Sequence, residues 1–165
     1  MHTSSVIFRV QPATSFKGEA RVPGDKSISH RSIMLGSIAE GTTHVTGFLE
    51  AEDCLSTMKA FQAMGVKVDG PKDGKVTVYG VGLHGLKPPK EALYLGNSGT
   101  SMRLLSGLLS GQRFDTVLTG DESLSKRPMK RVTDPLKSMG AQIGTTEKGT
   151  SPLHIKGGTP LKGMH

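Results

Sequence analysis

The chain has 165 residues, 35% of them hydrophobic, so it is long enough to bury the core of one ordinary domain. Its 21 basic and 14 acidic residues give a formal net charge of +7, which favours anionic partners. One cysteine excludes an internal disulfide framework, no apolar run approaches the roughly 20 residues that cross a bilayer, and the first residues lack a secretion signal, so we expect a cytoplasmic protein with no membrane partner.

The first part of the chain predicts a glycine-rich turn between a strand and a helix. The strand ends near Val22, and the helix runs from about Ser27 to Ala39. Glu40-Gly41 is expected to stop this helix, and a strand follows at Thr43–Gly47. The predicted order up to this point is therefore strand, helix, strand.

A second helix follows, with Glu52 or Asp53 as its cap. One face of it carries the apolar side chains of Cys54, Met58 and Phe61. Because the lone cysteine lies on that face, we expect it to be a core residue and not a nucleophile. Valines that alternate with polar residues then flank a turn, at positions 66, 68, 76 and 78, and predict a hairpin.

Two glycine patterns in this part match known binding motifs only in part. Gly80–Gly85 matches the dinucleotide-binding spacing, but the prolines that follow forbid the helix that such a site needs, so we expect a turn. Gly24–Ser27 resembles the end of a phosphate-binding P-loop, but the earlier glycine is out of register. The prediction that remains from this pattern is that Lys26 lies beside a helix N-terminus.

The second part of the chain repeats the order of elements. It predicts a helix from Thr100 to Ser110, a strand from Phe114 to Thr119, and a second helix with Pro128 near its first position. The buried stripe of that second helix consists of Met129, Val132, Leu136 and Met139. A closing hairpin again ends the unit.

Two segments about 72 residues apart, Gly24–Arg31 and Gly96–Arg103, share one design. Each opens with glycine, alternates small hydroxyl residues, places arginine seven residues on and runs into an apolar segment. Free backbone N–H groups and a nearby cation at a helix start bind anions. We therefore predict an α/β (α+β) fold of two βαβαββ units, residues 22–90 and 91–165, that hold anionic small molecules.

A third basic element is Ser123–Arg131, at the junction before the last helix. Such a charge run is usually a solvated face, and Lys130 and Arg131 fit that interpretation. Arg127 is our candidate ligand, because the proline after it fixes the turn. The histidines are scattered without ligand spacing, so we expect no metal.

Together these segments resemble the N-terminal part of the 5-enolpyruvylshikimate-3-phosphate synthase family. The matching stretches are Pro23–Arg31, Leu95–Arg103, Thr119–Leu124 and Arg127–Met129. The resemblance implies a two-domain enzyme with an inverse α/β barrel-like fold and three βαβαββ units per domain. This chain would supply two of these six units, its last ten residues would lead into a third, and residues 1–21 would give a strand segment to the missing second domain.

The resemblance also implies an activity. The family transfers the enolpyruvyl group of phosphoenolpyruvate to the 5-hydroxyl of shikimate 3-phosphate and releases phosphate, in chorismate and aromatic amino-acid biosynthesis. No metal or organic cofactor takes part, and the partners are the two substrates and the remainder of the synthase. We expect this chain to be inactive alone, because the family's acid–base residues come from later parts.

Site residues carry over by position. Lys26 resembles the lysine that touches both substrates, Ser27 and Arg31 resemble ligands of shikimate 3-phosphate, and Gly99 and Arg127 resemble ligands of phosphoenolpyruvate. Supporting residues are Asn97, Thr100 and Arg103. Leu104 replaces a proline that many members carry, a difference that bears on inhibitor sensitivity, including sensitivity to glyphosate.

Two rival interpretations remain open. The related transferase that acts on a UDP-sugar normally uses a loop cysteine as an acid, and no cysteine lies near Arg127. A stand-alone anion-binding or nucleic-acid-binding module is the other, although the basic residues are dispersed and only 4% of residues are aromatic. Salt dependence distinguishes nucleic-acid binding from the other interpretations, because binding to a phosphate backbone weakens steeply with salt.

Overall fold

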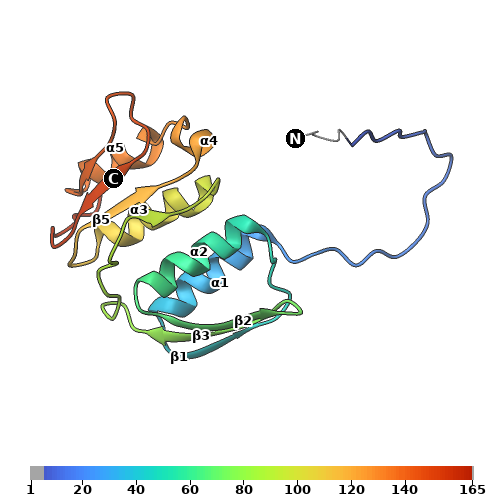
Figure 1. The fold of residues 1–165 in the computed structure, drawn as a ribbon, viewed down its shortest axis with the longest axis horizontal. Coiled ribbons are helices and arrows are strands. Elements are labelled where there is room, and N and C mark those ends of the chain that lie inside the picture. The colour runs from blue at the N-terminus through green and yellow to red at the C-terminus, as the bar shows by residue number, and fades with distance from the viewer. Residues whose placement is uncertain (1–5, 165) are drawn as a thin grey trace.

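A computed structural model of the protein describes residues 6–164 (Figure 1). The expected N-terminal strand segment at 1–21 therefore lies partly outside the described residues. Residues 6–25 contain no helix or strand and extend away from the rest of the molecule (Figure 1). The strand end expected near Val22 is thus not formed. The large apolar side chains in this stretch are exposed, Phe16 by 97%.

The first unit is a three-stranded sheet with two helices on one face (Figure 1). Its elements are α1 (Lys26–Ile38), β1 (Glu40–Val45), α2 (Glu52–Ala63), β2 (Lys67–Lys72) and β3 (Lys75–Val81). The strand order is β1-β3-β2, and both pairs are antiparallel. The hairpin predicted from the alternating valines is confirmed.

The second unit has a four-stranded sheet. Its elements are β4 (Leu93–Tyr94), α3 (Gly99–Ser110), β5 (Thr116–Thr119), α4 (Glu122–Ser125), α5 (Lys130–Ser138), β6 (Gln142–Gly144) and β7 (Leu153–Lys156). The strand order is β4-β5-β7-β6, in which β4 and β5 are parallel and the other pairs are antiparallel.

The two sheets match strand for strand, with one exception. In chain order and pairing, β1, β3 and β2 of the first sheet correspond to β5, β7 and β6 of the second. Strand β4 has no counterpart, so the outer edge of β1 carries no paired strand within the described residues. The mixed α/β class and the repetition are confirmed, and the first sheet lacks its opening strand.

The boundaries of two predicted strands differ from the sequence prediction, and β1 also ends two residues earlier than expected, at Val45. Strand β1 begins at Glu40 and not at Thr43, because Gly41 takes a positive φ of 91° and pairs with Gly80, so the glycine continues the strand instead of preceding it. Strand β5 begins two residues later than predicted, at Thr116.

The predicted second helix of the second unit is α5, which begins two residues after Pro128, and the short helix α4 before it was not predicted. Pro128 lies between them and not at the first position of a helix. Proline has no N–H to donate and disfavours the helical conformation in the residue before it, so the chain breaks there. In the predicted apolar stripe Met129 is 1% exposed, whereas Val132, Leu136 and Met139 are only half-buried.

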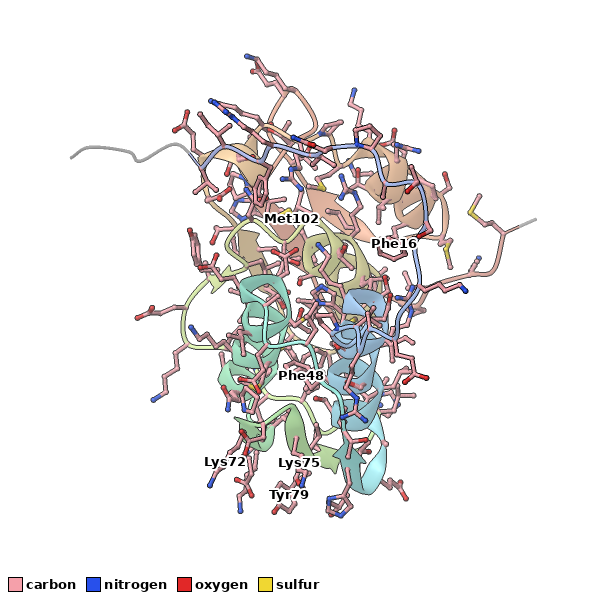
Figure 2. The ribbon with its side chains drawn as sticks, turned by 90° about the vertical axis from the view of Figure 1, so that its right-hand side faces the viewer. Phe16, Phe48, Lys72, Lys75, Tyr79 and Met102 are labelled. Carbon is pink, nitrogen blue, oxygen red and sulfur yellow. The ribbon has the colours of Figure 1, made fainter. Side chains whose placement is uncertain are left out.

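The core lies between the sheets and the helices, with α2 in contact with both α1 and α3. Cys54 and Phe61 are fully buried and Met58 is 6% exposed, so the predicted face of α2 is confirmed. Figure 2 shows Phe48 between the two helices of the first unit and Lys72 below them, at the turn from β2 to β3. None of the helices in the described part of the chain has the length and apolar character needed to cross a bilayer.

Candidate anion-binding site

The start of α1 is fixed by its own residues. Gly24 allows a close approach, because a Cβ there would lie 1.8 Å from the carbonyl oxygen of Gly47. The Asp25 side chain caps the helix by accepting the backbone N–H of Ile28 at 2.7 Å. The backbone N–H groups of Lys26 and Ser27, at the first two helical positions, have no partner within the helix and are left for a ligand.

The start of α3 repeats this construction. The Ser98 side chain caps it by accepting the backbone N–H of Ser101. In α1 the guanidinium of Arg31 donates to the carbonyl oxygen of Ser27 at 3.1 Å, and in α3 Arg103 donates to Gly99 at the same distance. The two glycine-led segments therefore share their geometry as well as their sequence pattern.

Lys26 has an acidic partner that sequence reasoning assigned to another role. Its Nζ lies 2.9 Å from a carboxylate oxygen of Asp53, which is in the first turn of α2 and not its cap. The hydrogen bond and the negative charge of Asp53 raise the pKa of Lys26 above its ordinary value. The positive charge of Arg127 acts weakly in the opposite direction, so the two cations lie within electrostatic range of each other.

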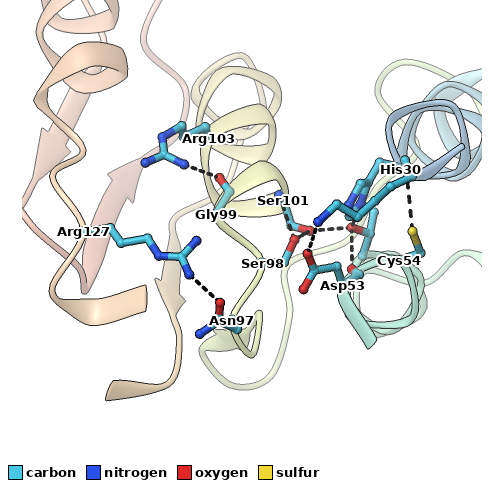
Figure 3. Close-up of polar contacts among 11 residues, drawn as sticks. His30, Asp53, Cys54, Asn97, Ser98, Gly99, Ser101, Arg103 and Arg127 are labelled. Atoms are coloured by element: carbon cyan, nitrogen blue, oxygen red, sulfur yellow. Dashed lines mark hydrogen bonds and ion pairs between the residues drawn. The ribbon is translucent and has the colours of Figure 1, made fainter. Parts of the chain in front are cut away.

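Arg127 is held through Asn97. Its Nη2 donates to the Asn97 side-chain oxygen at 2.5 Å (Figure 3), and the Asn97 amide nitrogen donates to both carboxylate oxygens of Asp121. Asp121 also caps α4 by accepting the backbone N–H of Leu124 at 2.7 Å. This backbone hydrogen bond and the Asn97 amide lower the pKa of Asp121 below its ordinary value.

Two guanidinium groups converge on Gly99. A Cβ at this position would lie 2.6 Å from Nη1 of Arg103 and 3.1 Å from Nη1 of Arg127. Within residues 6–164, neither of these arginines nor Arg31 forms an ion pair with a carboxylate. Uncompensated cations beside two helix N-termini form an electropositive site for anions such as phosphate and carboxylate.

The structure brings most of the predicted site residues together. Asn97, Gly99, Arg103 and Arg127 form one contiguous cluster (Figure 3), and Lys26 of α1 lies within electrostatic range of Arg127. The remaining three do not join it directly: Ser27 and Arg31 lie exposed on the first turns of α1, and Thr100 is half-buried in the first turn of α3.

Asp53 and Asp121 are the residues that sequence reasoning missed. An aspartate three residues before Leu124 is an N-cap pattern that could have identified Asp121. Asp53 lies 27 residues from Lys26 in the chain, and no local pattern predicts that pairing. In the described range no three His, Cys, Asp or Glu side chains gather as a metal-binding group.

Comparisons with known proteins agree on one family. The sequence model described as EPSP synthase (3-phosphoshikimate 1-carboxyvinyltransferase) matches residues 10–165. A 3-phosphoshikimate 1-carboxyvinyltransferase from Methylococcus capsulatus is 66% identical over 99% of this chain and 38% of its own length. The one from Hydrogenovibrio crunogenus is 62% identical over 98% of this chain and 36% of its own. This chain thus spans little more than a third of the length of these curated relatives.

Solved structures give the same result. EPSP synthase from Acinetobacter baumannii superimposes with a TM-score of 0.87 at 69% identity, over 91% of this chain and 34% of that one. The enolpyruvyl transferase NikO from Streptomyces tendae superimposes with a TM-score of 0.52 at 16% identity, over 82% of this chain and 30% of that one. The second likeness shows a shared fold alone.

Proposed function

Since the chain belongs to the EPSP synthase (3-phosphoshikimate 1-carboxyvinyltransferase) family, we propose that it is the N-terminal part of an enzyme that transfers the enolpyruvyl group of phosphoenolpyruvate to the 5-hydroxyl of shikimate 3-phosphate. The reaction releases inorganic phosphate and leads to chorismate. The observation that carries the proposal is the convergence of Arg103 and Arg127 on Gly99, at a helix start that repeats the one at Lys26.

The chemistry of the substrates suits this site. Each substrate carries a phosphate and a carboxylate, so a site for both must compensate several negative charges. Helix N-termini and guanidinium groups supply that compensation. We assign shikimate 3-phosphate to Lys26, Ser27 and Arg31, phosphoenolpyruvate to Lys26, Gly99 and Arg127, and supporting roles to Asn97, Thr100 and Arg103.

In the reaction the 5-hydroxyl loses its proton as its oxygen bonds to C2 of phosphoenolpyruvate, and C3 takes up a proton, which gives a tetrahedral intermediate. The C2–O bond to phosphate then breaks, C3 loses a proton and the double bond forms again. Lys26 and Arg127 stabilise the negative charge that collects on the departing phosphate, because they are positioned before the reaction begins. The groups that move these protons come from the remainder of the enzyme.

The proposal extends to the organisation of the whole enzyme. Residues 22–90 and 91–165 are two of the three units of one domain, and residues 1–21 pair with the second domain. The exposure of the apolar side chains between Val6 and Val22 supports an external partner for this segment. We place the enzyme in the cytoplasm, where the unpaired Cys54 stays reduced.

A chimera tests the function. This chain replaces the matching third of the Acinetobacter baumannii EPSP synthase, and phosphate release is measured with both substrates. We expect turnover by the chimera and none by the 165-residue chain alone. A folded chimera that releases no phosphate would contradict the proposal.

Two arginines of the same basic stretch provide a matched comparison in that chimera. Arg127→Gln removes a cation at Gly99 and should lower kcat/KM about a hundredfold, since a charge-assisted hydrogen bond to substrate is lost. Arg131→Gln removes an exposed cation and should leave kcat/KM within about twofold. Equal losses in the two variants would count against the assignment of Arg127.

A further inference from the structure

A buried chain of hydrogen bonds connects three helices behind the candidate site. His30 Nδ1 lies 2.7 Å from the hydroxyl of Thr57, which lies 2.6 Å from that of Ser101, which lies 2.5 Å from that of Ser98 (Figure 3). All four residues are completely buried. The series of hydrogen bonds starts at His30 in α1, passes through α2 and ends at the cap of α3.

This series of hydrogen bonds crosses the boundary between the two repeated units. Among the described residues, only two side-chain hydrogen bonds join residues 22–90 to 91–165. One runs from the Gln112 side chain to the carbonyl oxygen of Leu83, after the end of α3. The other joins Thr57 to Ser101, in the first turn of α3 and two residues from Gly99. It is therefore the one that lies next to the site.

The hydrogens in this series of hydrogen bonds permit more than one arrangement. Burial lowers the pKa of His30, so its imidazole is neutral at pH 7 and carries one N–H. Either Nδ1 donates and each hydroxyl passes its hydrogen on toward Ser98, or the three hydroxyls donate in the reverse direction and Nδ1 accepts. In a third arrangement the Thr57 hydroxyl donates to the backbone carbonyl oxygen of Asp53 at 3.4 Å and accepts from both His30 Nδ1 and Ser101. In every arrangement the Thr57 hydroxyl joins His30 to Ser101.

Removing a hydroxyl from the middle of this series of hydrogen bonds has a predictable effect. Without the Thr57 hydroxyl, His30 Nδ1 loses its partner and the Ser101 hydroxyl loses its link to α2. Buried polar atoms left unpaired are costly, so the first turn of α3 would shift to find new partners or water. The start of α1 has a separate anchor, since the Ser29 hydroxyl accepts the backbone N–H of Leu49 at 2.9 Å.

We propose that Thr57 and Ser101 are positioning residues, which hold the first turn of α3 and Gly99 in register with α1 so that the two repeated anion sites act on one pair of substrates. This inference rests on the proposed function and adds two residues that touch neither substrate. Because the shift falls on α3, phosphoenolpyruvate binding should suffer more than shikimate 3-phosphate binding.

Two substitutions at one position separate the hydrogen bond from packing. Thr57→Val keeps the shape and loses the hydroxyl, whereas Thr57→Ser keeps the hydroxyl and loses a methyl group. In the chimera, Thr57→Val should raise the KM for phosphoenolpyruvate about tenfold and the KM for shikimate 3-phosphate less than about threefold. Thr57→Ser should stay within about threefold for both. The reverse order of the two variants, or equal changes in both KM values, would overturn the inference.

Thr133→Val is the matched control. Thr133 is 1% exposed and its hydroxyl has no hydrogen-bond partner, so this variant also removes a buried hydroxyl but breaks no bond. It should leave both KM values within about twofold. A rise in the KM for phosphoenolpyruvate equal to that of Thr57→Val would show that any buried threonine hydroxyl has the same effect, which overturns the inference.

A second readout does not depend on turnover. Hydrogen exchange in residues 96–103 of the ligand-free chimera should be faster in Thr57→Val than in Thr57→Ser, because only the first variant releases the turn. If the unsubstituted chimera releases no phosphate, the proposed function fails. Hydrogen exchange then still tests whether the Thr57 hydroxyl holds the first turn of α3. Equal exchange in the two variants would then overturn the inference.

Discussion

At Gly99 the absence of a side chain leaves room for two guanidinium ends. The nearest atoms to a Cβ there belong to Arg103 and Arg127, at 2.6 and 3.1 Å. These ends can move, so Gly99→Ala should leave the fold intact and displace the cations. We expect the affinity of the chimera for phosphoenolpyruvate to fall about tenfold or more, and more than that for shikimate 3-phosphate, because charge-assisted hydrogen bonds are lost.

Gly107→Ala in the same helix is the control for this substitution. No atom lies within 4 Å of a Cβ at Gly107, and alanine in a helix interior is favoured over glycine by roughly 0.5–1 kcal/mol. This variant should keep both affinities and gain slightly in stability. Titration of each variant with each substrate measures the effect, and equal weakening of both substrates by Gly99→Ala would argue against a phosphoenolpyruvate site at Gly99.

Sequence patterns located the cations of the site and left their partners unidentified. Lys26 and Arg127 could be predicted because a helix start and a proline junction are local signals. Asp53 and Thr57 could not, because their roles depend on contacts with residues 27 and 44 positions away. Cys54 was predicted correctly as a core residue, since its position on an apolar helix face is also a local signal.

At the scale of elements, the helices that carry the site agree with prediction to within one residue at each end. Helices α1 and α3 follow glycine-led turns and have starts capped by Asp25 and Ser98, which are local signals in the sequence. The helix predicted to begin near Pro128 exists as α5 but begins two residues later, and α4 was missed, because a proline between two short helices gives the same signal as a proline at a helix start. The strand near Val22 was wrong as well, because a strand forms only where a neighbour pairs with it.

The link between α3 and α4 should depend on pH through Asp121. Its pKa is lowered below the ordinary value near 3.8, chiefly by the Leu124 N–H and then by the Asn97 amide. A lowered pKa contributes stability above that ordinary value, and this contribution is lost as the pH falls below it. Asp121→Asn should therefore lower the free energy of unfolding at pH 7, and the difference from the unsubstituted chain should shrink as the pH falls below 3.8.

Urea unfolding of the 165-residue chain between pH 7 and pH 3 measures this difference. Asp134→Asn, which changes an exposed carboxylate on α5 whose side chain makes no hydrogen bond within the described residues, should show no such trend. A difference for Asp121→Asn that persists unchanged at pH 3 would contradict a role for the ionised carboxylate.

At the scale of the whole molecule, the repetition places the site. The two sheets share one strand order, and hydrogen bonds from His30 through Thr57 to Ser101 connect α1 to the first turn of α3 where the units adjoin. The missing counterpart of β4 leaves one edge of β1 unpaired within residues 6–164, and the apolar side chains before Val22 are exposed. Both features agree with a chain that spans about a third of its relatives.

Hydrogen exchange of the chimera, with and without both substrates, tests most directly whether the two helix starts serve one site. We expect the substrates to slow exchange together in residues 24–31 and 96–103, over the same concentration range that supports turnover. Turnover accompanied by unchanged exchange in either segment would contradict it.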